Sequence, residues 1–583
     1  MMNPVPPREE NPCRPRHYKP DPCGPAPLEG PARQSLDVSH TRLLITAALF
    51  CLAFAIICVR LVGVTIFGTS DVPFAHRDPT TRPAHFRADI VDRNGVLLAS
   101  TLETPSLFAD SKQILDAKSA ARQLHRVLPD LDEADVAAKL ASGKGFIWIK
   151  RQLTPQEEVA VNRLGIPGLE FRDEGKRVYP KGNLFAHVVG YTNTDGKGLA
   201  GIERGLDQRL RRGGAPIQLS VDTRLQYILH DETEKAVSQF DAIGGMGIIM
   251  DVNTGEVLAM VSLPDFDPNQ IDKAKPDELF NRITLGDYEM GSVMKIFTVA
   301  MALDSHTTTM EGGYDATYPI HIGGFTIHDD HAQRRWLSVP EIFMYSSNIG
   351  AAKMATAAGA DLQREYLARF GLMKAPQFQL RELAAPLVPA VWRPVNTMTI
   401  AFGHGMSVSP LQVATGVSAA VNGGVMHPAT LLKQPEGEPV PGKRVIAPET
   451  SIDMRKLLRL VVEHGTGSLA KDSGYLIGGK TGTAEKVAGR RYLRHELLSS
   501  FVGVFPINNP RYVVLISIDE PHGDKQTHGF ATGGWVAAPA VKDTIERMAS
   551  IVGIQPVDEN SPEIRRSLMV DLPLPQGRKL AAN

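Results

Sequence analysis

Ser292 and Lys295 stand three residues apart at the start of an apolar stretch, an arrangement suited to nucleophilic catalysis. On a helix, side chains with this spacing share one face, so the amine lies within hydrogen-bond reach of the hydroxyl. The serine also lies at the positive end of that helix, which favours a developing alkoxide. The amine must be neutral to take a proton, and burial or a second cation lowers a lysine pKa; Lys480 is the expected second cation.

The Ser-x-x-Lys pattern alone is weak, because Ser468 and Lys471 repeat it. What distinguishes Ser292 is the order of two further motifs, since only this serine is followed by 346–348 (Ser-Ser-Asn) and then by 480–483 (Lys-Thr-Gly-Thr). Chance is a poor explanation for all three in this order. We predict that the catalytic residues are Ser292, Lys295, Ser346, Asn348 and Lys480, and that the substrate-binding residues are Thr481, Gly482 and Thr483.

Together these side chains have the functional groups that acyl transfer needs. Ser292 is expected to attack a carbonyl while Lys295 takes its proton. Ser346 is expected to pass the proton to the leaving amine, and the Asn348 amide to hold the substrate backbone.

The third motif, residues 480–483, is expected to form an edge strand. Gly482 would let a substrate backbone come close, and the Thr483 N–H would point at the oxyanion together with that of Ser292. The hydroxyls of both threonines, with the Lys480 charge, are expected to hold a substrate carboxylate.

The elements that must position these motifs are expected to form one α+β domain over residues 216–552. Two apolar runs around an Asn253-x-Gly255 turn predict a hairpin, and a similar strand pair follows near the end of the domain. A helix precedes the hairpin and another follows the last strand, which indicates a mostly antiparallel sheet flanked by helices. The predicted strands are 247–251, 256–261, 500–505 and 512–518, and the predicted helices end near Phe240 and Ser550.

Before this domain, the chain contains a segment suited to a membrane. The uncharged run 43–59 continues as apolar residues to position 67 after Arg60. About 20 helical residues cross a bilayer, so we predict a transmembrane anchor over 43–67, with a buried core helix or a cleaved signal peptide as the less favoured alternatives. The proline-rich residues 1–42 are expected to be a disordered cytoplasmic tail.

Two further regions contain no recognisable set of catalytic residues. Residues 68–215 alternate short strands with helical stretches near 115–140 and 155–164, and are expected to form a separate N-terminal domain. Residues 553–583 are expected to be a loose C-terminal tail.

Composition excludes several classes of function. The formal net charge is −1, so no overall basic field draws the chain to nucleic acid. The 4 cysteines are all at or before position 58, which excludes a disulfide framework in the main body. The stretch 328–331 (His-Asp-Asp-His) has metal-ligand residue types, but without a third clustered ligand we favour a polar loop. We expect neither a metal nor a cofactor.

These motifs, in this order, resemble those of the penicillin-binding proteins and serine β-lactamases. Other segments are similar to the class B, monofunctional transpeptidases, so that the resemblance covers about residues 43–550. The Ser-Ser-Asn motif resembles the septal, FtsI-type branch of that class, whereas the elongation branch usually carries Asp at position 348. The segments that carry the resemblance are Phe86–Gly95, Arg177–Pro180, Gly201–Glu203, Asp222–Gln226, Tyr288–Ser292, Phe402–Gly405 and Lys480–Lys486.

The resemblance implies a serine β-lactamase-like transpeptidase domain on an N-terminal pedestal. It implies that a peptidoglycan stem peptide acylates Ser292 through its penultimate D-Ala, that an amine of a neighbouring stem resolves the acyl-enzyme, and that β-lactams are trapped at the same serine. It also implies a periplasmic catalytic domain at a bacterial inner membrane, with an FtsW-type glycosyltransferase and other divisome proteins as partners. An elongation-type transpeptidase, a D,D-carboxypeptidase or β-lactamase, and a β-lactam-binding sensor remain open alternatives.

Overall fold

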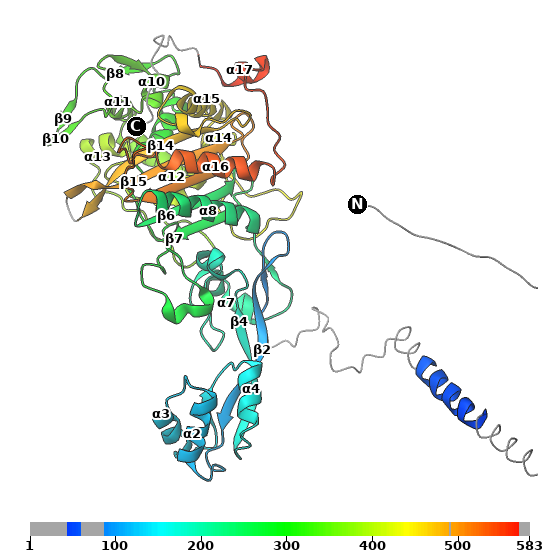
Figure 1. The fold of residues 1–583 in the computed structure, drawn as a ribbon. Helices are drawn as coiled ribbons and strands as arrows, with labels where there is room; N and C mark the ends of the chain where they lie inside the picture. The colour runs from blue at the N-terminus through cyan, green and yellow to red at the C-terminus, as the bar shows by residue number, and fades with distance from the viewer. Residues whose placement is uncertain (1–43, 60–86, 489–490, 571–583) are drawn as a thin grey trace, which may run out of the picture. The chain divides into compact units, whose positions relative to one another are not determined.

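The computed structural model describes residues 44–59, 87–488 and 491–570 (Figure 1). The chain divides into two units between Pro79 and Thr80. The predicted tail over 1–42, the end of the predicted anchor over 60–67 and residues 571–583 lie outside the described residues.

In the first unit, the structure describes one helix, over residues 44–59. Its large apolar side chains are exposed, with Phe50 at 65% and Val59 at 73%. Among the described residues, no helix combines the length and the apolar character that a membrane crossing requires.

The N-terminal part of the second unit, here called the pedestal (residues 87–218), is built on a sheet in the strand order β3-β2-β1-β5, with β4 also paired to β2. Helices α2, α3 and α4 pack on one side of β2 and β3 around a small apolar core. This core lies at the lower end of the unit in Figure 1. The elements are β1 (Ile90–Val91), β2 (Leu97–Ala109), α2 (Ala117–Val127), α3 (Glu133–Leu140), β3 (Ile147–Lys150), α4 (Pro155–Asn162), β4 (Leu169–Val178), α5 (Ala186–Val189), α6 (Gly201–Gly205), α7 (Asp207–Arg211) and β5 (Ile217–Gln218).

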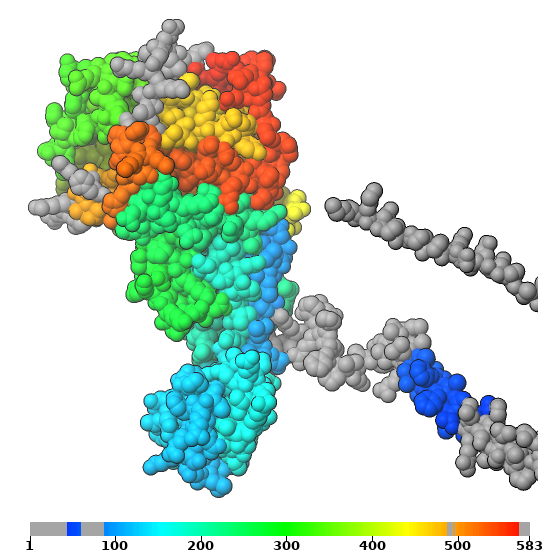
Figure 2. All heavy atoms as spheres, viewed as in Figure 1, coloured from blue at the N-terminus to red at the C-terminus, as the bar shows by residue number. Residues whose placement is uncertain are grey.

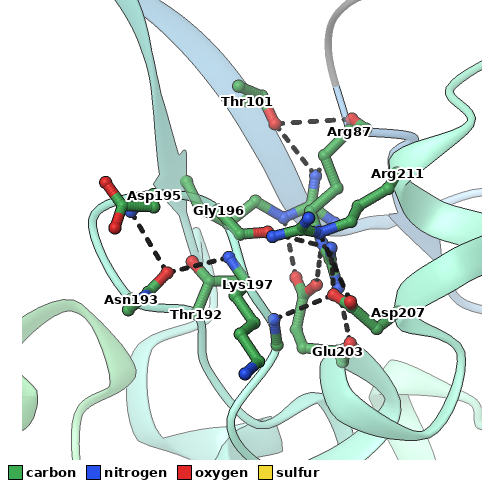
Figure 3. Close-up of polar contacts among 12 residues, drawn as sticks. Arg87, Thr101, Thr192, Asn193, Asp195, Gly196, Lys197, Glu203, Asp207 and Arg211 are labelled. Carbon is green, nitrogen blue, oxygen red and sulfur yellow. Dashed lines mark hydrogen bonds and ion pairs between the residues drawn. The ribbon is translucent and has the colours of Figure 1, made fainter.

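A buried ion cluster holds the pedestal together where the described chain enters it (Figure 3). The Glu203 carboxylate is fully buried and pairs with Arg87 and, at 2.7 Å, with Arg177. Arg87 also pairs with Asp207 at 2.7 Å and donates to the carbonyl of Gly196 at 3.1 Å. Breaking a buried pair by removing one partner costs about 3–5 kcal/mol, because the other charge stays buried. The cluster therefore joins β4 and α6 to the first residues of the pedestal.

The C-terminal part of the second unit contains an antiparallel sheet in the order β14-β15-β16-β6-β7. The predicted hairpin and the predicted second strand pair are confirmed as neighbours in this sheet (Figure 1). The strands are β6 (Gly244–Asp251), β7 (Val257–Leu263), β14 (Gly478–Ala488), β15 (Arg491–Phe505) and β16 (Tyr512–Asp519).

Each face of this sheet is covered by its own helices. Side chains alternate between the faces along a strand, so Ile249 packs in the core under α8 (Thr223–Gln239) and α16 (Ala537–Ala549), and Ile248 in the larger core on the other side. That larger core contains the helices around the catalytic motifs. These are α9 (Lys295–Asp304), α10 (Val339–Met344), α11 (Asn348–Ala358), α12 (Ala360–Arg369), α13 (Pro394–Ile400), α14 (Pro410–Val421) and α15 (Pro448–His464).

Short elements complete this part of the unit. They are the strands β8 (Gly313–Asp315), β9 (Ile320–Ile322), β10 (Phe325–Ile327), β11 (Trp336–Ser338), β12 (Val425–Met426) and β13 (Lys443–Arg444), with 3₁₀ turns that include η4 (Gly291–Met294).

The described part of the predicted loose tail is packed, which corrects that expectation for residues 553–570. Helix α17 (Pro562–Leu568) contacts α15, and Leu568 is buried in the larger core. Glu559 binds the buried guanidinium of Arg459 in α15 at 2.8 Å. The polar sequence of this segment does not predict the packing, because Arg459, which Glu559 binds, lies about a hundred residues earlier in the chain.

Candidate active site

Ser292 lies in the 3₁₀ turn η4, which runs directly into helix α9. The turn begins at Gly291, whose φ of +51° is a conformation that side chains disfavour. A Cβ built on Gly291 would lie 2.5 Å from the carbonyl oxygen of Thr483, so only glycine permits this approach. The close contact places strand β14 directly beside the serine.

The amine of Lys295 is fully buried and contacts four oxygen atoms. Nζ lies 2.7 Å from Ser292 Oγ, 2.7 Å from the carbonyl of Ser346 and 2.7 Å from Asn348 Oδ1. A carbonyl and an amide oxygen can only accept, so two N–H groups of the amine are used by them. In the neutral amine this leaves the lone pair free to face Ser292, which is the geometry of a general base.

Burial lowers the pKa of Lys295 to about 7, while the nearby carboxylates of Asp330 and Asp329 act in the opposite direction. Burial also lowers the pKa of Lys480 well below its usual value, and the Lys295 charge lowers it further. Burial is the largest cause for both amines, and the repulsion between the two charges is mutual, so each amine favours loss of the proton from the other. An arriving substrate carboxylate would raise the pKa of Lys480 again and keep the charge there.

Ser346 bridges the two amines. Its Oγ lies 3.1 Å from Lys295 Nζ and 3.0 Å from Lys480 Nζ. The residue has φ +58°, which is uncommon for a residue with a side chain. This backbone conformation turns both its carbonyl and its hydroxyl toward the amines, so that a continuous polar path runs from Ser292 to the edge strand.

The Asn348 amide has a defined orientation at the start of α11. Its Nδ2 donates to the carbonyl of His328 at 3.0 Å, and a carbonyl cannot bind the oxygen end of an amide. Oδ1 therefore faces Lys295, and the second N–H of the amide is left for a substrate.

The Lys-Thr-Gly-Thr motif lies in β14, which is an edge strand of its sheet, as predicted. A Cβ on Gly482 would lie 2.6 Å from the carbonyl of Met290, so the glycine permits close packing behind the strand. The Thr483 hydroxyl accepts from the N–H of Gly533 at 3.1 Å, which leaves its own proton free for a carboxylate. Thr481 Oγ lies 2.7 Å from the hydroxyl of Thr466, just after α15.

A cavity of about 570 Å³ lies along the second half of β14. Its walls include Tyr288 and Glu289, just before the serine turn, and Glu485 and Lys486 in the strand. The cavity follows the strand beyond the Lys-Thr-Gly-Thr motif, and Ser292 is not among the residues that line it.

The sequence prediction missed three groups at this site. Gly533 and Thr466 bind the two threonine hydroxyls, and Asp329 binds the turn that holds Ser346. The only sequence signal was the His-Asp-Asp-His stretch, which we interpreted as a polar loop. Within residues 44–59, 87–488 and 491–570, no group of three or more potential metal ligands occurs.

Two family models match the chain, and together they cover most of the second unit. Residues 83–239 match the penicillin-binding protein dimerisation domain. Residues 245–546 match the penicillin-binding protein transpeptidase domain, which contains every predicted site residue.

Curated relatives and solved structures agree with these matches. The chain is 42% identical over 482 residues to a probable peptidoglycan D,D-transpeptidase FtsI of Caulobacter vibrioides, covering 80% of this chain and 82% of that protein. It is 31% identical over 509 residues to the peptidoglycan D,D-transpeptidase FtsI of Escherichia coli, covering 81% and 84%. The fold is similar to penicillin-binding protein 3 of Mycobacterium tuberculosis in complex with aztreonam, with a TM-score of 0.65, 24% identity, and coverage of 81% of this chain and 98% of that one.

Proposed function

The chain belongs to the class B penicillin-binding proteins, which combine a dimerisation domain with a transpeptidase domain, and from this we infer that it is a serine-type peptidoglycan D,D-transpeptidase of the FtsI type. Its substrate is a stem peptide ending in D-Ala-D-Ala. The fold is mixed α and β, and each of the two domains contains a five-stranded sheet.

In the first half-reaction, Ser292 Oγ attacks the carbonyl carbon of the penultimate D-Ala. Lys295 accepts the hydroxyl proton, and the backbone N–H groups of Ser292 and Thr483 stabilise the oxyanion. The bond to the terminal D-Ala then breaks, and Ser346 delivers a proton to the leaving amine. The product is an ester between Ser292 and the shortened peptide.

The second half-reaction repeats these steps in reverse with a different amine. An amine of a neighbouring stem peptide enters where D-Ala left and attacks the ester carbonyl, which forms the new peptide bond. The ester bond to Ser292 breaks, and the proton of the amine passes through Ser346 and Lys295 to Ser292 Oγ. Lys480, with the hydroxyls of Thr481 and Thr483, would hold the terminal carboxylate during acylation.

One observation carries this proposal: Ser292, Lys295, Ser346 and Lys480 form an unbroken series of contacts from 2.7 to 3.1 Å, although the chain brings them from three separate elements. Acyl transfer needs a nucleophile, a base and a proton path in contact, and this series contains all three.

The test is a product assay with a stem pentapeptide ending in D-Ala-D-Ala, with and without an added acceptor stem. We expect release of the terminal D-Ala and formation of a new amide that depends on the acceptor. Release of D-Ala with hydrolysis alone would indicate a carboxypeptidase. Rapid turnover of penicillin instead of a stable adduct would indicate a β-lactamase.

We further propose that the chain is held in a bacterial inner membrane by a single helix, with the catalytic domain in the periplasm, and acts at the division septum beside an FtsW-type glycosyltransferase and other divisome proteins. The exposed apolar side chains of residues 44–59 and the FtsI names of the relatives support this. A tagged copy is expected in the membrane fraction and at the septum of dividing cells. Labelling along the side wall would favour the elongation role.

A further inference from the structure

We propose that Asp329 is a positioning residue for acylation, because its carboxylate clamps the turn over residues 346–349 and so holds Ser346 and Asn348 against Lys295. The inference rests on the acyl transfer proposed above and adds a residue from outside the catalytic motifs.

The clamp consists of two hydrogen bonds, one on each side of Asn348. Asp329 Oδ2 accepts from the hydroxyl of Ser347 at 2.8 Å, and Oδ1 accepts from the N–H of Ile349 at 2.9 Å. Asp329 is only 8% exposed, and hydrogen bonds to a buried carboxylate are strong. Both oxygen atoms of one side chain thus bind the same short turn.

The turn needs such a clamp because Ser346 has φ +58°. A residue with a side chain keeps this conformation only where its surroundings enforce it. If the turn relaxed, the Ser346 carbonyl would leave its position 2.7 Å from Lys295 Nζ, and its hydroxyl would lose contact with both lysines. The base and the proton path depend on the same backbone conformation.

The residue before Asp329 supports the same turn. The His328 carbonyl accepts from Asn348 Nδ2 and thereby directs the amide oxygen to Lys295. Two consecutive residues therefore hold the side chain of Asn348 and the residues on either side of it.

Asp330 provides a matched control. Asp329 and Asp330 both act on the Lys295 charge and raise its pKa against the effect of burial, while Lys480 faces the same amine from β14. Asp330 is exposed, so its substitution removes a similar charge without touching the bonds from Asp329 to the turn. Comparing the two residues separates the clamp from the charge.

The experiment measures acylation by fluorescent penicillin against pH in the full chain, together with the final number of labelled sites per protein. For Asp329→Ala we expect a rate on the alkaline plateau that is lower by about 100-fold. For Asp329→Asn, which keeps one acceptor, we expect a loss of about tenfold. For Asp330→Asn we expect a plateau within about threefold of the wild type.

Two readouts distinguish positioning from mere stabilisation. All three variants should still label one site per molecule at long times, whereas a misfolded variant labels fewer sites. The rise of the acylation rate with pH should move to lower pH in Asp329→Asn and Asp330→Asn, because removing a carboxylate lowers the pKa of Lys295. If Asp329→Ala fails to fold, Asp329→Asn decides the question.

The proposed role of Asp329 would be overturned by an acylation rate on the alkaline plateau of Asp329→Asn within about twofold of the wild type. It would also be overturned if the variant lost labelled sites but the remaining sites reacted at the wild-type rate. A wild-type protein that is not labelled at all would overturn the proposed acyl transfer as well. The two failures are therefore distinguishable.

Discussion

Ser292→Ala is expected to abolish covalent labelling by fluorescent penicillin and to leave the fold intact. The hydroxyl of Ser292 is the group that forms the ester, and it lies 2.7 Å from Lys295 Nζ. The other hydroxyl at that amine, Ser346 Oγ at 3.1 Å, is expected to carry protons and not to attack. The side chain is partly exposed near the start of a short turn, so its removal leaves the core unchanged. Gel fluorescence measures the labelling, and circular dichroism with thermal melting checks the fold.

The matched control is Ser468→Ala, because Ser468 belongs to the other Ser-x-x-Lys match. Ser468 lies in a short 3₁₀ turn, and the side-chain amine of Lys471 pairs at 3.7 Å with Glu559. Labelling of this variant should equal that of the wild type. Persistent labelling of Ser292→Ala, or loss of labelling in Ser468→Ala, would show that the nucleophile has been assigned to the wrong residue.

Lys295→Ala is expected to slow acylation by about 10²- to 10⁴-fold while non-covalent binding of penicillin persists. The variant removes the base but leaves Lys480, Thr481 and Thr483, which are expected to hold the carboxylate. It also leaves the Ser346 carbonyl and Asn348 Oδ1 without their donor, so Lys295→Met, which preserves more of the buried volume, should be measured beside it. Stopped-flow acylation separates the binding constant from the acylation rate.

The pH dependence of the wild type gives a second measurement of the same role. Burial lowers the pKa of Lys295 to about 7, so the neutral amine becomes the main form above that pH. Acylation should therefore rise with pH through about 7 and then level off, and neither Lys295 variant should show this rise. Lys471→Ala is the matched control and should show the same rise of acylation with pH as the wild type. If Lys295→Met also kept this rise, the assignment of Lys295 as the base would be contradicted.

Much of the fold could be predicted because its signals are local. The apolar runs on either side of Asn253 and Gly255 are short and are joined by turn residues, and β6 and β7 form there. The order of Ser292, Ser346 and Lys480 in their motifs was sufficient to predict one site and an edge strand, and the structure brings these residues together.

The remaining features depend on contacts between segments remote in sequence. Asp329 looked like part of a polar loop, since nothing near it in the chain shows that its carboxylate binds Ser347. The positive φ of Ser346 is likewise enforced from outside its own segment, and Glu559 in the expected loose tail is ordered by Arg459.

The sequence by itself determined which residue types stand in the motifs of the candidate site and in which kind of element they are expected, because residue type and short-range periodicity are properties of neighbouring residues. Only the tertiary structure decided how those groups are oriented and charged. The pKa of Lys295 depends on burial by distant helices, and the orientation of Asn348 depends on the carbonyl of His328. Burial and long-range hydrogen bonds arise when remote segments pack together, and spacing along the chain does not encode them.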